Sequence, residues 1–476
     1  METTTAVTTT RHNQEPRRGL LQMITIEPVM FIYMCSTFIK FPVFQSLLYE
    51  KACLEKYFMD FERCSDVSAV HADVDLQQRA NHLLMISTLF LMVPSIFSSL
   101  LLGSLCDVWS IKSTMLIPFI GLLFADVNYI VQCLFMGSNA YFLILSDIVF
   151  GLTGGFNAII GILFAYSVKA NKTSVRSERV ALLEGIIGLG STIGSIFSGF
   201  IRQKIGYTWI FVIITVMHVL AIGYILFFVK DLNATNSEQS SQEEQAVPVG
   251  LRQSISRRIR EIGNVYCGRE RDPKTQRFLN LVLIALAIEL IGFAGLMDIL
   301  FSYLRYQFKW TDKEYGWFSG TGSALGSLTV IFVYPFLHKG IGLSNAILAI
   351  IGLVSKMSNL VILVLASSNW VAALSVIPLA FSRFISTGLR SMASFYVKNH
   401  EQGKIFSFIA LLEGVSFLIA SFIFNGIYPL TLNFFPGTML LGVAGALLIP
   451  VIFLIYIQMN NGHPTTEEPE RDSLAA

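Results

Sequence analysis

Charged side chains occur in strongly apolar stretches of this chain, and the spacing of two of them suits the binding of an anion. Arg383 and Arg390 are seven residues apart, which places both on nearly the same face of a helix at about 100° per residue. Two guanidinium groups on one face could hold a carboxylate or a phosphate through paired hydrogen bonds. The alternative is an internal salt bridge, for which Glu413 is the obvious partner of Arg390.

A repeated pentapeptide carries a second kind of chemistry. The residues Ala181-Leu-Leu-Glu184-Gly185 recur 229 positions later as Ala410-Leu-Leu-Glu413-Gly414. A charge in the middle of a bilayer costs roughly 2.5–3.5 kcal/mol, so we expect Glu184 and Glu413 to have a function such as proton coupling. The alternative is pairing with Arg179, Lys169 or Arg390 at a cytosolic gate.

The composition shows which elements must position these residues. A 53% hydrophobic and 14% charged chain is far from the roughly 25% charge of soluble domains. We therefore predict an all-α polytopic membrane protein with twelve transmembrane helices in two six-helix pseudo-repeats. The predicted spans are 27–49, 81–103, 113–135, 141–165, 180–201, 209–229, 278–303, 315–337, 344–366, 371–397, 405–427 and 436–458.

Lys and Arg residues predominate in the segments on the N-terminal side of the membrane, which places both termini in the cytosol. The predicted organisation is a tail, a bundle, a linker, a second bundle and a second tail: 1–26, 27–229, 230–277, 278–458 and 459–476. Two repeated units in the same orientation are typical of secondary transporters, which build a site between their halves.

The loop after the second predicted span contains Gly103, Asp107 and Lys112. This spacing resembles the loop signature of the major facilitator superfamily. In that architecture a tight cytosolic turn carries a carboxylate that pairs with a neighbouring helix end, so we expect these residues to act in gating.

Further motifs resemble the proton-coupled folate transporter family of that superfamily. They are Glu27-Pro28, Arg390-Ser-Met-Ala-Ser394, Glu401-Gln-Gly-Lys404 and Phe435-Pro-Gly437. Tyr224-Ile-Leu-Phe-Phe228 and Gly322-Ser-Ala-Leu-Gly326 are more similar to its lysosomal branch than to its folate branch. The chain departs from the folate branch because no histidine lies between His218 and His338.

The resemblance implies that helices 1, 4, 7 and 10 line a central cavity. The expected solute-binding residues are therefore Lys40, Asp147, Glu289, Asp298, Arg383 and Arg390. Glu289 and Asp298 are nine positions apart, on opposite helix faces, so both cannot face the cavity squarely; Glu289 is the preferred candidate. Glu184 matches the family's acidic residue implicated in proton coupling.

Cys53 and Cys64 share a loop placed outside the cytosol, where a disulfide can form. The family's bridge to the loop between helices 7 and 8 cannot form, because 304–314 contains no cysteine. The sequence has no nucleotide-binding loop, zinc spacing or nucleophile elbow, so we expect no enzyme activity, no cofactor, no metal and no nucleic-acid partner.

These observations predict a secondary active transporter of a small, anionic organic solute, driven by proton symport in the plasma membrane or the lysosomal membrane. Its expected partners are the solute, protons and the lipid bilayer. The alternatives are an uncoupled facilitator of the same fold and a non-transporting receptor or scaffold.

Overall fold

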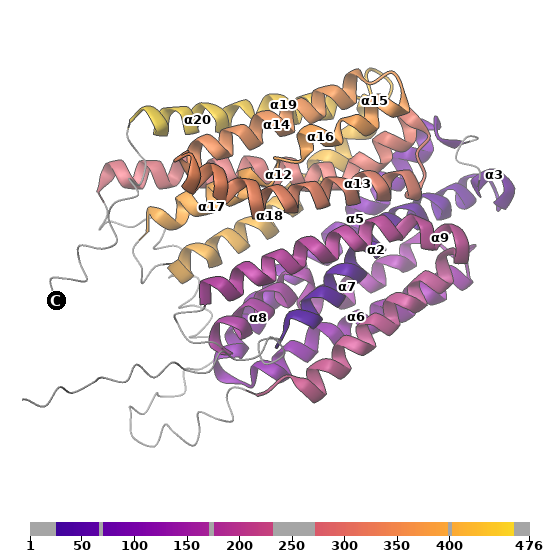
Figure 1. The fold of residues 1–476 in the computed structure, drawn as a ribbon. Helices are drawn as coiled ribbons and strands as arrows, with labels where there is room; N and C mark the ends of the chain where they lie inside the picture. Colours follow the sequence, from indigo (N-terminus) through magenta and orange to yellow (C-terminus); the bar gives the residue numbers. More distant parts are fainter. Residues whose placement is uncertain (1–24, 66–69, 171–175, 232–271, 398–401, 461–476) are drawn as a thin grey trace, which may run out of the picture.

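The chain folds into two groups of roughly parallel helices (Figure 1). The computed structural model describes residues 25–65, 70–170, 176–231, 272–397 and 402–460, and these ranges contain helices and no strand. Most of the predicted tails and central linker therefore lie outside the described residues. The all-α fold predicted from the sequence is confirmed.

The described residues of the first half form eight named helical elements. They are α2 (Glu27–Lys56), α3 (Phe61–Ser65), α5 (Val74–Val108), α6 (Ile111–Leu134), η1 (Ala140–Leu143), α7 (Ile144–Leu152), α8 (Gly155–Ala170) and α9 (Arg176–Phe228).

The second half is divided more finely. Its elements are α12 (Pro273–Phe308), α13 (Asp312–Leu328), η3 (Thr329–Val333), η4 (Phe336–Gly340), α14 (Asn345–Leu365), α15 (Asn369–Leu374), α16 (Val376–Leu379), α17 (Phe384–Phe395), α18 (Gln402–Thr431), α19 (Thr438–Ala446) and α20 (Leu448–Met459).

Eleven stretches in the described part of the chain are long and apolar enough to cross a membrane. The sequence predicted twelve, and the difference lies in α9, whose apolar part Leu182–Phe228 is 47 residues long. Two spans of about 20 residues fit this length. The chain turns between them at Gly206, where φ is 75° and ψ is −178°, a conformation that favours glycine. The turn lies at the end of the molecule that also carries α3 (Figure 1).

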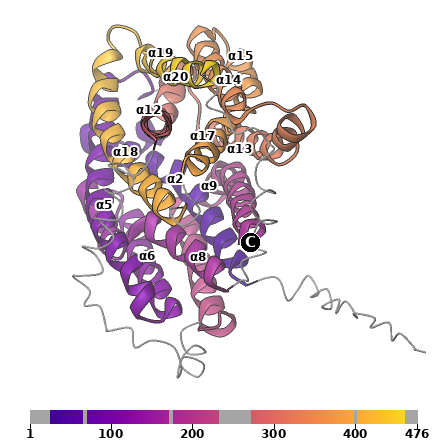
Figure 2. The same cartoon turned by 90° about the vertical axis from the view of Figure 1, so that its left-hand side faces the viewer.

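Buried apolar side chains form one large cluster in each half. The first contains residues between Ile26 and Val229, and the second contains residues between Phe278 and Ile457. Figure 2, which looks along the helices, shows the two bundles side by side. Each half therefore has its own core, which leaves the contact between the halves to a small number of helices.

Helix starts follow local sequence signals. The Asp73 side chain accepts a hydrogen bond from the amide of Leu76 and caps α5. Thr311 and Glu314 form a capping box at the start of α13, an arrangement that satisfies two backbone amides at once. These caps fix where the helices next to the loops begin.

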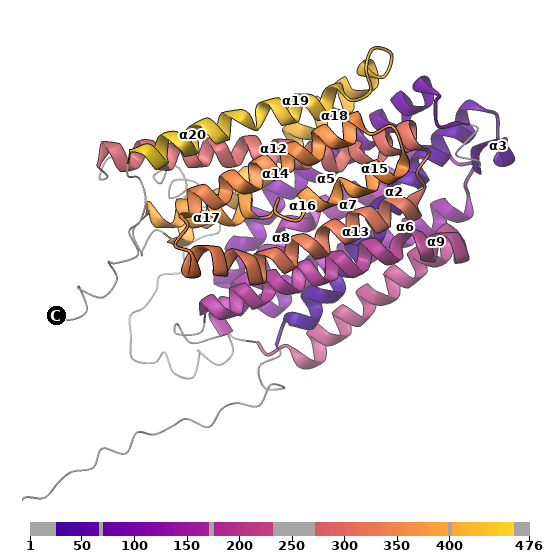
Figure 3. The same cartoon turned by 45° about the horizontal axis from the view of Figure 1, so that its top comes forward.

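Predicted helices 4 and 10 are both interrupted. α7 and α8 meet at Gly154 and Gly155, whose φ values are 118° and 62°. α15, α16 and α17 follow one another along one line (Figure 3), with a break between Leu379 and Phe384. At the repeat spacing of 229 residues, Gly154 corresponds to Arg383. The two breaks therefore occupy equivalent places in the two halves.

Candidate functional site

The halves meet most closely where the first part of α9 crosses α13. A Cβ atom on Gly320 would lie 2.3 Å from Ile196 Cγ1, and one on Gly316 would lie 2.5 Å from the Ser195 carbonyl oxygen. A Cβ atom on Gly199 would lie 2.3 Å from the Lys313 amide nitrogen. The absence of side chains at these glycines lets the two backbones approach each other.

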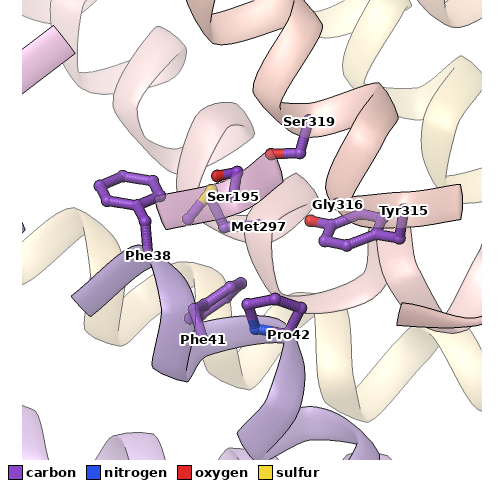
Figure 4. Close-up of a pocket in the computed structure, with 8 residues that line it drawn as sticks. All are labelled: Phe38, Phe41, Pro42, Ser195, Met297, Tyr315, Gly316 and Ser319. Atoms are coloured by element: carbon purple, nitrogen blue, oxygen red, sulfur yellow. The ribbon is translucent and has the colours of Figure 1, made fainter. Parts of the chain in front are cut away.

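A pocket opens beside this crossing and receives residues from both halves (Figure 4). Aromatic rings, a thioether and two serine hydroxyl groups converge on it. Its lining consists of Phe38, Phe41 and Pro42 from α2, Ser195 from α9, Met297 from α12, and Tyr315, Gly316 and Ser319 from α13. The lining thus combines apolar rings with a few polar groups, a combination that small-molecule sites share.

Arg383 lies one helical turn from this pocket. Ser191 and Ser323 are four residues from the pocket serines on α9 and α13, a rise of about 6 Å. Their hydroxyl oxygens are 2.8 Å apart, and Arg383 Nη2 donates a hydrogen bond of 3.0 Å to Ser323 Oγ. The predicted guanidinium is thus placed at the contact between the two halves, at the start of α17.

Arg390 lies two turns farther along α17, next to the repeated glutamates. It donates a hydrogen bond to Glu413 of the same half, and its Nη1 lies 3.8 Å from Glu184 Oε1 of the other half. The Glu184 side chain is 52% exposed, against 27% for Glu413. Arg390 therefore lies between two carboxylates at equivalent positions of the repeat. Its pairing with Glu413 agrees with the salt bridge expected from the sequence, and its contact with Glu184 joins the two halves.

Lys40 and Asp147 lie inside the first half. Lys40 Nζ donates to Tyr129 Oη at 3.2 Å, and this hydroxyl donates to Asp147 Oδ1 at 3.1 Å. Ser87 donates to the other Asp147 oxygen at 2.6 Å. These bonds form a polar network within one bundle, and the idea that Lys40 and Asp147 bind the solute stays a prediction.

Glu289 and Asp298 lie inside the second half. Lys356 of α14 donates to Glu289 at 3.2 Å, and Asn425 of α18 donates to Asp298 at 2.6 Å. The two carboxylates meet different neighbouring helices, consistent with their positions on opposite faces of α12. A role for either in binding the solute also stays a prediction.

The predicted gating loop connects α5 and α6. Gly103 belongs to α5, and Lys112 Nζ donates a hydrogen bond of 2.7 Å to the carbonyl of Leu226, near the end of α9. A lysine at this position stabilises the end of a helix, where carbonyl groups lack intrahelical partners. The Asp107 side chain lies outside the described part of the structure.

Cys53 and Cys64 form a disulfide that joins the end of α2 to α3. No group of three or more His, Cys, Asp or Glu residues suited to a metal ion occurs in the described ranges.

A cluster that was not predicted joins the halves at the end of the molecule nearest this disulfide. Asp312 is fully buried and accepts a hydrogen bond from Ser46, and it pairs with Arg202 and, at 3.8 Å, with Arg305. Ser46 and Arg202 belong to the first half, and Arg305 and Asp312 to the second. Sequence analysis missed this cluster because Arg202, Arg305 and Asp312 lie just outside the predicted spans 180–201, 278–303 and 315–337, where charges are ordinary.

The pocket-lining serines and aromatic residues were also missed, since attention was on charged residues in helices 1, 4, 7 and 10. The available signal was the four-residue spacing of serines on two glycine-rich helices, Ser191 with Ser195 and Ser319 with Ser323.

Two pseudo-repeated bundles, interrupted helices at equivalent positions and charged contacts between the halves define a secondary transporter of the major facilitator type. The model of the Major Facilitator Superfamily matches residues 29–421. The chain belongs to this superfamily, and the resemblance to its proton-coupled folate transporter family is confirmed by relatives of known activity.

The lysosomal proton-coupled steroid conjugate and bile acid symporter of Homo sapiens is 26% identical over 92% of this chain and 95% of its own length. The symporter of the same name from Gallus gallus is 26% identical over 92% of this chain and 94% of its own. The proton-coupled folate transporter of Bos taurus is 26% identical over 95% of this chain and 96% of its own. The protein is therefore a multi-pass membrane transporter and not an enzyme.

Solved structures agree on the fold. The crystal structure of the human organic anion transporter MFSD10 has a TM-score of 0.64 at 13% identity, covering 93% of this chain and 100% of that one. The inward open xylose transporter XylE from E. coli has a TM-score of 0.59 at 12% identity, covering 92% and 98%.

Proposed function

We propose that this protein moves an amphipathic organic anion across a membrane by alternating access of its two halves, with proton symport. The observation that carries the proposal is the position of Arg383, one helical turn from an aromatic pocket that both halves build. A site shared by the halves is where alternating access requires the solute to bind. The relatives named for steroid conjugates and bile acids support a solute with an apolar ring body and an anionic group.

Different residues would bind the anionic group and the ring body of such a solute. Arg383 would attract the anionic group, aided by the N-terminus of α17, where backbone amides and the helix dipole favour negative charge. The serine hydroxyls beside it would supply further hydrogen-bond donors. Phe38, Phe41 and Tyr315 would cover the ring body.

Glu184, Arg390 and Glu413 supply a basis for proton coupling. Protonation of Glu184 would remove the negative charge that meets Arg390 from the other half, and so weaken a contact between the halves. An exposed carboxylate can exchange its proton with water, which a coupling group must do. Glu413 would keep Arg390 paired during this exchange.

Uptake of a radiolabelled steroid sulfate into proteoliposomes, with and without an inward proton gradient, tests both the proposed anion site and the proposed proton coupling. Arg383→Gln should lower uptake by about tenfold or more, because a hydrogen bond to a charged group contributes about 1.5–3 kcal/mol. Arg383→Lys should retain part of the activity. Glu184→Gln should keep downhill uptake but lose its acceleration by the gradient.

Full uptake by Arg383→Gln would contradict the proposed anion site. Equal gradient dependence in Glu184→Gln and the wild type would remove Glu184 from the coupling route. Wild-type uptake that ignores the gradient would identify an uncoupled facilitator instead.

A further inference from the structure

Ser36, Asp126 and His218 form a buried hydrogen-bonded chain in the first half, apart from the solute path. Their exposed fractions are 0%, 0% and 2%. His218 Nε2 lies 2.8 Å from Ser36 Oγ, and His218 Nδ1 lies 2.6 Å from Asp126 Oδ2. The chain connects α2, α6 and the second part of α9. Ionisable groups at membrane depth are functional candidates by default.

The hydrogen bonds among Ser36, His218 and Asp126 determine how many protons these three side chains hold. The Ser36 hydroxyl donates to the Tyr33 carbonyl at 2.8 Å, which uses its single hydrogen. Ser36 Oγ must then accept a hydrogen bond from His218 Nε2–H. A further proton must lie between His218 Nδ1 and Asp126 Oδ2, because two lone pairs would repel at their separation.

We propose that the Asp126–His218 pair is a proton-binding site, and that this structure shows its occupied state. The bound proton lies either on Asp126 as a carboxylic acid or on His218 as an imidazolium, and the pair holds the same number of protons in both forms. Asp126 Oδ1 has no hydrogen-bond partner among the described residues, which favours the carboxylic-acid form of the occupied pair over the imidazolium form. An ionised carboxylate would leave that buried oxygen poorly satisfied.

Other titratable groups close to the site come from three elements. Tyr33 and Lys40 belong to α2, Tyr129 to α6 and Asp147 to α7. Lys40 interacts electrostatically with Asp147 and also with Asp126. Tyr129 links Lys40 to Asp147 through hydrogen bonds, which makes Asp147 the main counter-charge of the lysine.

Release of the proton changes a bond within α2. A neutral His218 with its hydrogen on Nδ1 donates to ionised Asp126, and Nε2 becomes an acceptor. The Ser36 hydroxyl then turns from the Tyr33 carbonyl toward His218. Because serine hydroxyls bonded to a preceding carbonyl bend helices, proton occupancy sets the local shape of α2.

The segment of α2 around Ser36 packs closely against α9. A Cβ atom on Gly194 would lie 2.5 Å from the Cys35 carbonyl oxygen and 2.9 Å from Phe38 Cβ. Phe38 also lines the pocket between the halves. The proton site is therefore connected to the proposed solute path through two residues of α2, and only this use of the proton in transport rests on the proposed function.

Infrared titration of the full-length protein in detergent tests the site without transport. Raising the pH should remove either a carboxylic-acid band or an imidazolium band from the wild type, and Asp126→Asn and His218→Gln should each lack that change. His338→Gln is the matched control, because this histidine bonds the Leu343 carbonyl elsewhere in the chain. An ionised Asp126 beside a neutral His218 over the whole pH range would overturn the proposal.

Ser36→Ala keeps every titratable group and guards against misfolding of the other variants. It removes the acceptor of His218 Nε2–H, so the infrared bands of the pair should shift in frequency relative to the wild type. An unchanged spectrum would overturn the assigned hydrogen-bond direction. If steroid sulfate uptake proves independent of a proton gradient, the proposed function fails, while the infrared titration still decides the proton site.

Discussion

Asp73 joins two structural roles in one side chain. Its Oδ1 accepts the Leu76 amide at 3.1 Å, which caps α5, and the Lys56 ammonium donates to it at 2.7 Å. Tyr57 donates to its other oxygen. Partial burial alone would raise the pKa of Asp73, but the hydrogen bonds from Lys56, Tyr57 and the amide hold the pKa below its ordinary value.

The two roles can be separated by a pair of substitutions. Asp73→Asn keeps a good capping residue but removes the charge, whereas Asp73→Ala removes both. We expect Asp73→Ala to unfold more easily than Asp73→Asn by about 1 kcal/mol, measured by thermal unfolding in detergent near neutral pH. Equal stability of the two variants would contradict a capping role.

The pH dependence follows from the lowered pKa. The stabilisation by ionised Asp73 is fully present above the unfolded value of about 3.9 and is lost as the pH falls through the lower folded value. The contact should therefore persist at the mildly acidic pH of a lysosome. Asp73→Asn should show a smaller loss of stability than the wild type between about pH 4 and more acidic conditions.

The helices could be predicted from the sequence, because apolar stretches of bilayer length give a strong signal. Arg383 and Arg390 could be predicted for the same reason, since charges stand out there. The interruption of helix 10 between Leu379 and Phe384 could not be predicted with certainty from Pro378, because membrane helices tolerate proline. Nor could the sequence show that Glu289 meets Lys356 of α14, since a helical period gives faces but not their neighbours.

The glycines of α9 differ in what surrounds them. Substitutions within this one helix can therefore test whether its close crossing with α13 is needed for stability. Gly199 packs against the backbone of α13, whereas a Cβ atom on Gly223 would meet nothing within 4 Å. Gly199→Ala should force α9 and α13 apart and lower the melting temperature. Gly223→Ala should have no effect or stabilise by up to about 1 kcal/mol, because alanine favours a helix. Equal melting temperatures of the Gly199→Ala and Gly223→Ala variants would show that the close crossing is not required for stability.

At the scale of the whole molecule, charged contacts join the halves at two depths. Glu184 and Arg390 meet on one side of the proposed solute path, and the Asp312 cluster lies at the end nearest the disulfide. Arg305 also lies over the rings of Tyr49 and Phe301, at 4.5 Å and 4.4 Å from their centroids. Asp312, Ser46 and Arg305 are buried and Arg202 is partly exposed, so we expect this cluster to close that end of the proposed path.

Alternating access requires this closure to open, and Asp312 provides the means to test it. Asp312→Asn removes the carboxylate shared by Arg202 and Arg305, and loss of one partner of a buried ion pair costs about 3–5 kcal/mol. A shift of that size can reverse a two-state preference. The pocket should therefore become accessible from the disulfide end.

A cysteine introduced as Ser319→Cys reports this accessibility, because Ser319 lines the pocket and the described cysteines outside the disulfide, Cys35, Cys106 and Cys133, are buried. We expect an impermeant thiol reagent applied from the disulfide end to label Ser319→Cys about tenfold faster or more when Asp312→Asn is present. Asp60→Asn, an exposed carboxylate next to α3, is the matched control and should not change the rate. Labelling that is equally slow with and without Asp312→Asn would show that the buried cluster does not hold this end of the path closed.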